Sequence, residues 1–209
     1  MPFHGFARTS NWQLSDSQAS ANAVELTLVL DVSNGHEHYW PHSAKLELQV
    51  CLTDTLTLRL NNYNLGHEAL AISQALHSYF AISDIRHIQL TGFEQSTYHD
   101  CLQQWQAKAQ AGAITFNGET DRVYLNVPTQ VQLIDSGWQR RIQLQAQGSH
   151  SAIVWNPWID KARQLSGFAD EAWSNMVCIE TANVLDDHLT LNAGEHHQLV
   201  LEISCTTQP

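Results

Sequence analysis

Two titratable side chains, far apart in the sequence, have the types needed for an acid and a base. His77 follows the alternating run Ala69 to Ser73 and lies in the stretch Gln74 to Phe80, with Leu76 before it and Ser78-Tyr79-Phe80 after it. Alternation predicts a strand, so we expect the imidazole to leave the sheet and point away from the core. Glu180 lies in the apolar run Val177 to Ala182, where a charge is costly unless it is paired or used. Catalysis by His77 as acid and Glu180 as base is one interpretation, and a structural, hydrogen-bonded histidine is the other.

Two further residues are of types that bind sugars. Asp121 opens the segment Asp121-Arg122-Val123-Tyr124, where its carboxylate could accept hydrogen bonds from sugar hydroxyls. Capping of its own turn is the alternative for Asp121. Trp155 belongs to Val154-Trp155-Asn156-Pro157-Trp158, whose two large aromatics suit the apolar faces of a pyranose ring. Packing in the core is the alternative for Trp155.

A cluster of histidines raises the question of a metal site. His36, His38 and His42 lie close together, and imidazole is a common metal ligand. Their spacing does not place them on one face of a regular element, so a solvated connection between strands is the better interpretation. His196 and His197 are adjacent, and adjacent side chains on a strand point to opposite faces. We therefore expect no metal site at these histidines.

The charge balance limits the partners. The formal net charge is −11, from 21 acidic and 10 basic residues among 209. Such a field repels nucleic acids and anionic membrane surfaces, so we expect neither as a partner. An anionic substrate would then need specific Arg or Lys contacts.

The cysteines and the apolar runs bear on the compartment. The four cysteines form no CxxC pair. The chain shows neither a signal-peptide pattern at its start nor a membrane-length apolar run, and together these features predict a soluble, cytoplasmic protein.

Alternating runs predict an all-β fold. The clearest runs are Val24 to Val32, Leu46 to Leu52 and Leu56 to Leu60, and Asp54 predicts a hairpin turn between the last two. Further strands are expected at residues 87–91, 122–125, 131–134, 141–145, 152–156, 176–180, 188–191 and 198–204. The stretch 101–111, followed by Gly112, predicts a short helix. The expected architecture is an antiparallel β-sandwich in a single domain over residues 1–209.

Five motifs in a fixed order resemble a known family. They are His4-Gly5-Phe6-Ala7-Arg8 followed by Trp12, the histidine strand Leu76 to Phe80, Thr120 to Asn126, Val154-Trp155-Asn156-Pro157-Trp158, and Val177-Cys178-Ile179-Glu180-Thr181. The chain resembles the aldose 1-epimerase-like superfamily. Within it, the chain is most similar to the hexose-6-phosphate mutarotases, also called glucose-6-phosphate 1-epimerases. The resemblance runs from His4 to about residue 203.

The resemblance implies a fold, a reaction and residue roles. The fold would be a β-sandwich of the galactose-mutarotase type. The reaction would interconvert the α and β anomers of a hexose 6-phosphate, glucose 6-phosphate in the first place, without metal or cofactor. His77 falls on the general acid of the family and Glu180 on its general base. Arg8 and Asp121 fall on substrate-binding positions, and His4 and Trp155 are further candidates for binding.

The sequence departs from the family pattern at its front. Members begin upstream with several strands and a glycine-rich segment that carries another substrate-binding arginine, and Phe3 stands where a polar group is usual. We therefore expect a shortened sandwich with an exposed sheet edge near Val24 to Val32, through which the chain could self-associate. Two alternatives follow: a sugar-phosphate-binding protein of the same fold with weak or no turnover, and an incomplete piece of an ordinary enzyme.

Overall fold

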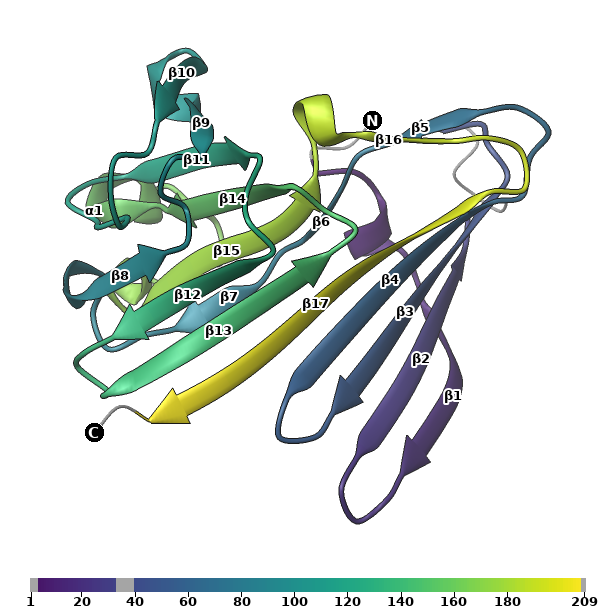
Figure 1. The fold of residues 1–209 in the computed structure, drawn as a ribbon, viewed down its shortest axis with the longest axis horizontal. Helices are drawn as coiled ribbons and strands as arrows, with labels where there is room; N and C mark the ends of the chain where they lie inside the picture. Colours follow the sequence, from purple (N-terminus) through teal and green to yellow (C-terminus); the bar gives the residue numbers. More distant parts are fainter. Residues whose placement is uncertain (1–3, 33–39, 208–209) are drawn as a thin grey trace. The chain divides into compact units, whose positions relative to one another are not determined.

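The protein is built almost entirely from antiparallel strands. The structure, a computed structural model, describes residues 4–32 and 40–207, and Figure 1 shows their course. The chain divides into two compact units. The first runs through Ile72 and includes Leu189–Ile203, and the second comprises Ser73–His188 and the residues from Ser204 onward. The expected all-β, antiparallel fold is confirmed.

The first unit is a twisted sheet whose strands lie in the order β1-β2-β3-β4-β17. These strands are β1 (Gln13–Ala19), β2 (Val24–Asp31), β3 (Ala44–Leu52), β4 (Leu56–Asn64) and β17 (His196–Thr207), and β5 (Leu70–Ile72) pairs separately with β16 (Leu189–Leu191). Leu52 lies opposite Leu56, so the predicted hairpin between β3 and β4 is confirmed. Leu30, Val32 and Ala44 form a small buried core in this unit.

The edge of this sheet differs from expectation. β2 is paired on both sides, with β1 and with β3, so the run from Val24 is not the edge strand. The edge strand of the described sheet is β1, which is exposed at every position. Leu14 is its only large aliphatic residue, so the segment carries no alternating pattern that would have predicted a strand.

The second unit is a sandwich of two sheets. One has the order β13-β12-β8, and the other has the order β10-β9-β11-β14-β15-β6, with β7 also paired to β15. The strands of the first sheet are β8 (Ile88–Thr91), β12 (Gln130–Asp135) and β13 (Arg140–Gln147). Those of the second are β6 (Gln74–Leu76), β7 (Tyr79–Ala81), β9 (Thr97–Asp100), β10 (Gln106–Ala109), β11 (Thr120–Leu125), β14 (Ser151–Asn156) and β15 (Met176–Asn183).

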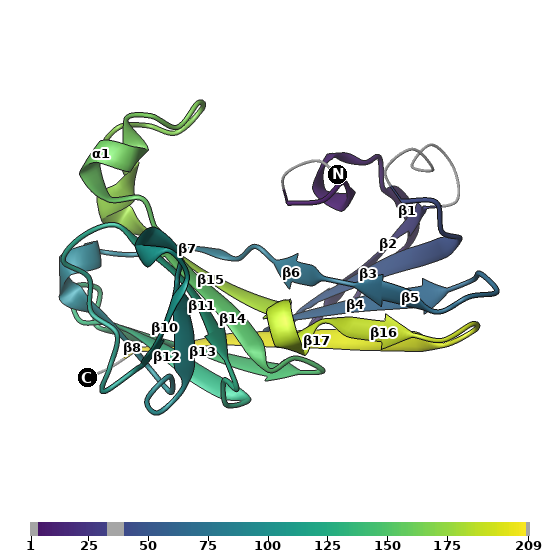
Figure 2. The ribbon, with the colours of Figure 1, turned by 90° about the horizontal axis from the view of Figure 1, so that it is seen from above.

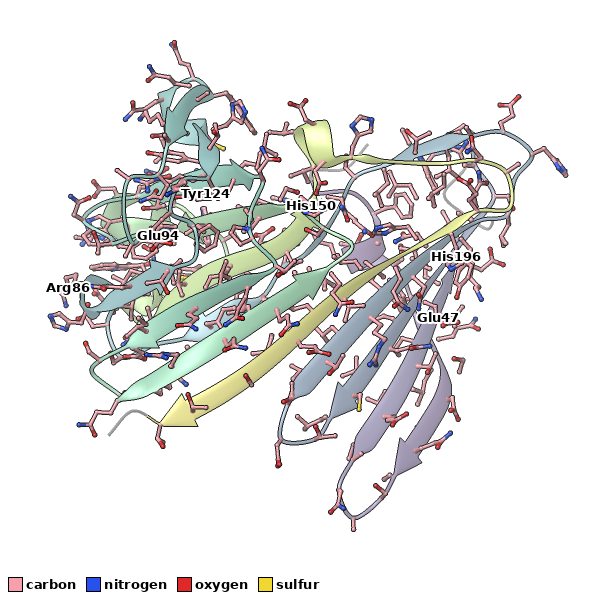
Figure 3. All side chains as sticks on the ribbon, in the orientation of Figure 1. Glu47, Arg86, Glu94, Tyr124, His150 and His196 are labelled. Carbon is pink, nitrogen blue, oxygen red and sulfur yellow. The ribbon has the colours of Figure 1, made fainter. Side chains whose placement is uncertain are left out.

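The two sheets of the second unit enclose its core. Val131 and Leu144 from one sheet line a small cavity together with Ala152 and Ile179 from the other, so these faces are packed against each other. Tyr124 of β11 is fully buried in the same unit, and Figure 3 shows it among these strands. Since residues alternate between faces, the opposite face of the larger sheet carries the intervening positions of β11, β14 and β15.

The predicted helix over residues 101–111 is wrong. Only Cys101–Gln103 forms a 3-10 turn (η3), after which Gln104 and Trp105 adopt left-handed φ values of 52° and 61°. The chain then turns back, and β10 pairs with β9. Asp100 stabilises this arrangement by accepting hydrogen bonds from Leu102 N at 3.2 Å and from Lys108 Nζ at 2.8 Å. Strand pairing therefore outweighs the helical propensity of a Gln- and Ala-rich stretch.

The remaining helical elements are short and were not predicted. They are η1 (Ala7–Thr9), η2 (Ile85–His87), α1 (Trp158–Ala162), η4 (Ala172–Asn175) and η5 (Leu185–Asp187). Figure 2 shows α1 projecting away from the strands of the second unit, in the connection between β14 and β15. Among the described residues, no helix is long and apolar enough to cross a membrane.

Candidate active site

His77 lies in a break between two short strands that pair with the same partner. β6 ends at Leu76 and β7 begins at Tyr79, and both pair with β15. The register is the same on both sides of the break, with these residues opposite each other: Ala75 and Ala182, Leu76 and Thr181, Tyr79 and Cys178, Phe80 and Val177. Continued across the break, this register sets His77 opposite Glu180. Inside the break, Ser78 N donates to Leu76 O at 2.9 Å.

The side chains of His77 and Glu180 are in direct contact. Nδ1 of His77 lies 3.2 Å from Oε1 of Glu180. The imidazole side chain is 29% exposed and the carboxylate side chain is 10% exposed. A nearly buried carboxylate therefore has a partner that can exchange protons near neutral pH, and one edge of the pair reaches solvent. The structure brings together the two residues that the sequence marked as acid and base candidates.

Cys178 is a second partner of Glu180. Its thiol is fully buried, and Sγ donates a hydrogen bond to Glu180 Oε1 at 3.3 Å. Burial raises the pKa of Cys178, and the negative charge and hydrogen bond of Glu180 raise it further. The thiol therefore stays protonated and remains a donor. Sequence reasoning missed this contact, although residues two apart on a strand share a face and could have indicated it.

Asp121 and Trp155 lie on the same face of the sheet as Cys178. Trp155 of β14 lies opposite Cys178, and Asp121 of β11 lies opposite Trp155. Directly opposite residues of antiparallel strands point to the same face, so these side chains form one row across three strands. Tyr79 of β7 adds an aromatic ring to this row, with its centroid 6.2 Å from that of Trp155. Both sugar-binding candidates of this unit thus lie on the same face of the sheet as Glu180.

Asp121 also has a thiol neighbour. Burial raises the pKa of Cys101 to about 12, and the charge of Asp121 and a hydrogen bond with it contribute. Burial likewise raises the pKa of Glu119, although Lys161 acts in the opposite direction. Asp121 thus lies at one end of the row, in an acidic and partly buried environment. Neighbours from the turns around β11 orient its carboxylate.

Arg8 and His4 lie in the first unit. Arg8 is exposed within η1, whose backbone is tied by Thr9 N donating to Phe6 O at 3.0 Å. The indole of Trp12 donates to Ala7 O at 2.9 Å, so the apolar side of this motif packs on the core of the unit. The substrate-binding roles of Arg8 and His4 remain predictions.

Of the histidine cluster, the structure describes only His42. His42 packs edge-on against Trp40, with ring centroids 5.0 Å apart, while His36 and His38 lie outside the described residues. His196 stacks on Tyr63 at 5.6 Å in β4 and β17.

Comparison with known proteins defines the class. A family model described as aldose 1-epimerase matches residues 1–204, and the chain belongs to the aldose 1-epimerase family. A protein from Cenchrus ciliaris named "putative glucose-6-phosphate 1-epimerase" is 33% identical over 202 residues, which are 92% of this chain and 61% of that protein. The chain therefore spans about 61% of the length of this relative.

Solved structures show the same fold. The crystal structure described as a "putative mutarotase" from Salmonella typhimurium is similar with a TM-score of 0.92 and 27% identity, covering 100% of this chain and 69% of that one. A galactose mutarotase-like protein from Clostridium acetobutylicum matches with a TM-score of 0.74 at 16% identity, covering 98% of this chain and 69% of that one. The expected β-sandwich of the galactose-mutarotase type is confirmed.

Proposed function

We propose that the chain carries the acid and base of a hexose-6-phosphate 1-epimerase, with glucose 6-phosphate as the expected substrate. The observation that supports this most is the 3.2 Å contact between His77 Nδ1 and Glu180 Oε1 on a partly exposed sheet face. The names of the relatives in the aldose 1-epimerase family support the substrate class. The hexose, the phosphate and the two residue roles are all part of the proposal.

The reaction needs one proton removed and one proton delivered. Glu180 takes the proton of the anomeric hydroxyl, His77 protonates the ring oxygen, and the bond between C1 and the ring oxygen breaks to give the open-chain aldehyde. Rotation about the C1–C2 bond presents the other carbonyl face. His77 then takes the proton of the attacking hydroxyl, Glu180 returns its proton to the carbonyl oxygen, and the ring closes as the other anomer. No net proton, electron or cofactor is consumed.

The spacing of the pair suits this chemistry. The anomeric oxygen and the ring oxygen are bonded to the same carbon, so an acid and a base that serve them must stand close together. In the free protein His77 and Glu180 are direct neighbours, and a bound sugar would take up both groups at once. Because the Glu180 side chain has low exposure, water competes little for the proton that Glu180 takes from the sugar.

The remaining site residues would bind the sugar. Trp155 offers an aromatic surface for a pyranose face, and Asp121 in the same row accepts hydrogen bonds from hydroxyls. Arg8 would pair with the phosphate through two parallel hydrogen bonds, which matters in a chain whose net charge of −11 opposes anions. His4 would assist Arg8 from the same motif.

A conservative substitution tests the base. Glu180→Gln keeps the size of the side chain and removes its ability to accept the proton, so anomerisation of glucose 6-phosphate should fall by about two to four orders of magnitude. Glu171→Gln is the matched control, because Glu171 is exposed and directly precedes η4. Unchanged anomerisation in Glu180→Gln contradicts the assignment. Sugar binding by the parent without faster equilibration supports the alternative of a binding protein.

A further inference from the structure

The thiol of Cys178 is fixed in direction by the strand that carries it. Cys178 lies within β15 and is paired on both sides, with Tyr79 of β7 and with Trp155 of β14. Two flanking strands prevent the backbone from shifting, and the thiol is 0% exposed. Glu180 stands two residues further along the same face, which brings Sγ within 3.3 Å of Oε1.

The two polar partners of Glu180 both contact the same carboxylate oxygen. Oε1 lies 3.2 Å from His77 Nδ1 and 3.3 Å from Cys178 Sγ. Both contacts are made to Oε1, so Oε2 is the oxygen that we expect to receive the proton. A carboxylate held at one oxygen by a thiol of its own strand and by an imidazole from the break between β6 and β7 has its plane and its second oxygen set.

We propose that Cys178 is a positioning residue that orients the Glu180 carboxylate and presents Oε2 to the substrate. This inference rests on the proposed role of Glu180 as the base. A thiol suits the task because S–H is a weak hydrogen-bond donor. It orients the carboxylate but lowers the basicity of the carboxylate less than a hydroxyl in the same place would. Burial keeps the proton on sulfur throughout, which leaves the thiol a donor in every step of the reaction.

The Asp121 carboxylate shows the same combination. Cys101 follows β9, and burial raises its pKa, with further contributions from the charge of Asp121 and a hydrogen bond with it. Asp121 and Glu180, which lie on the same face of the larger sheet, therefore each have a protonated thiol as a neighbour. This repetition favours a role in setting carboxylate direction over accidental packing of one cysteine.

The test combines kinetics with a readout that does not need turnover. Cys178→Ala removes the donor, so the kcat of anomerisation should fall about tenfold. The KM should change less than about twofold, because Cys178 does not touch the sugar. In the same variant the ¹³C carboxyl resonance of Glu180 at neutral pH, assigned with Glu180→Gln, should move, since its Oε1 has lost a donor. Cys178→Ser keeps a donor and makes it stronger, so the resonance should not move in the direction seen for Cys178→Ala. Cys51→Ala is the matched control, because Cys51 Sγ lies 3.9 Å from Glu25 Oε1 in an exposed pair of the first unit.

The outcomes separate the two proposals. A moved Glu180 carboxyl resonance in Cys178→Ala with an inactive parent supports the thiol contact and contradicts the proposed function. An active parent whose kcat and Glu180 carboxyl resonance are unchanged in folded Cys178→Ala overturns the inference. If Cys178→Ala fails to fold, Cys178→Ser decides: the stronger donor should move the Glu180 carboxyl resonance and change kcat with little change in KM, and unchanged values overturn the inference.

Discussion

Tyr79 and Trp155 both lie opposite Cys178, and their aromatic rings approach each other. They come from strands on either side of β15, yet their ring centroids are 6.2 Å apart with an interplanar angle of 71°. Cys178 lies on the central strand between them and is fully buried, so we expect the two rings to shield its thiol from solvent. The same rings form an aromatic surface beside His77 and Glu180.

Removing the indole should therefore have two effects. Trp155→Ala should raise KM about tenfold or more for both phosphorylated and free hexose, because stacking does not depend on the phosphate. It should also make Cys178 reactive toward a thiol reagent in the folded protein. Trp138→Ala is the control, since Trp138 is 51% exposed and lies in the turn between β12 and β13. A KM for both sugars that matches the parent would remove Trp155 from the binding surface.

Arg8 should discriminate between phosphorylated and free sugars. Arg8→Ala should raise KM for hexose 6-phosphate about 10- to 100-fold and leave the free hexose almost unaffected, because charge-assisted bidentate hydrogen bonds are lost only with the anion. Steady-state kinetics on both sugars measures the ratio. Arg163→Ala, at the exposed end of α1, should change neither value. Equal losses on both sugars would mean that Arg8 acts on the ring or on folding.

The buried thiols predict a pattern of alkylation and of alkaline stability. Cys205 is exposed and should react first with iodoacetamide at pH 8, whereas Cys101, with a pKa of about 12, should react slowly. A thiol whose pKa is raised by folding binds its proton more tightly in the folded state. Stability is therefore unaffected at neutral pH and falls as the pH rises from the ordinary value of about 8.5 toward about 12. Urea unfolding from pH 7 to 10.5 should show a steeper loss for the parent than for Cys101→Ala, and parallel curves would contradict this account.

The edge strand β1 predicts self-association. An exposed edge offers unpaired backbone groups to another chain, and β1 carries the exposed side chain of Leu14, 58% accessible, with Asp16 as its only charge. We propose that two chains pair through β1, so Leu14→Lys should shift sedimentation toward the monomer. Leu102→Lys introduces the same change at an exposed site in η3 and should have no effect. A parent that is monomeric at every concentration tested would exclude this interface.

Sequence patterns predicted the strands that bury one face, and failed where pairing decides the structure. The sequence of strands β2, β3 and β4 alternates, so their existence followed from period two, although β3 begins two residues before the predicted run and β4 extends four residues beyond it. The stretch from Cys101 became a turn and a strand because Asp100 and the pairing with β9 outweigh propensity. His77 and Glu180 were identified by type and motif. Their direct opposition depends on the register between β6, β7 and β15, which no local pattern contains.

The central claim is that His77 and Glu180 act as one acid–base unit. The most direct measurement is the rate of α–β exchange of glucose 6-phosphate, followed by NMR, for the parent, His77→Gln, Glu180→Gln and the double variant. Each single variant should lose about two to four orders of magnitude. The double variant should be little worse than the slower single variant, because each group is ineffective without the other. Losses that multiply in the double variant, or a single variant with the rate of the parent, would contradict the account.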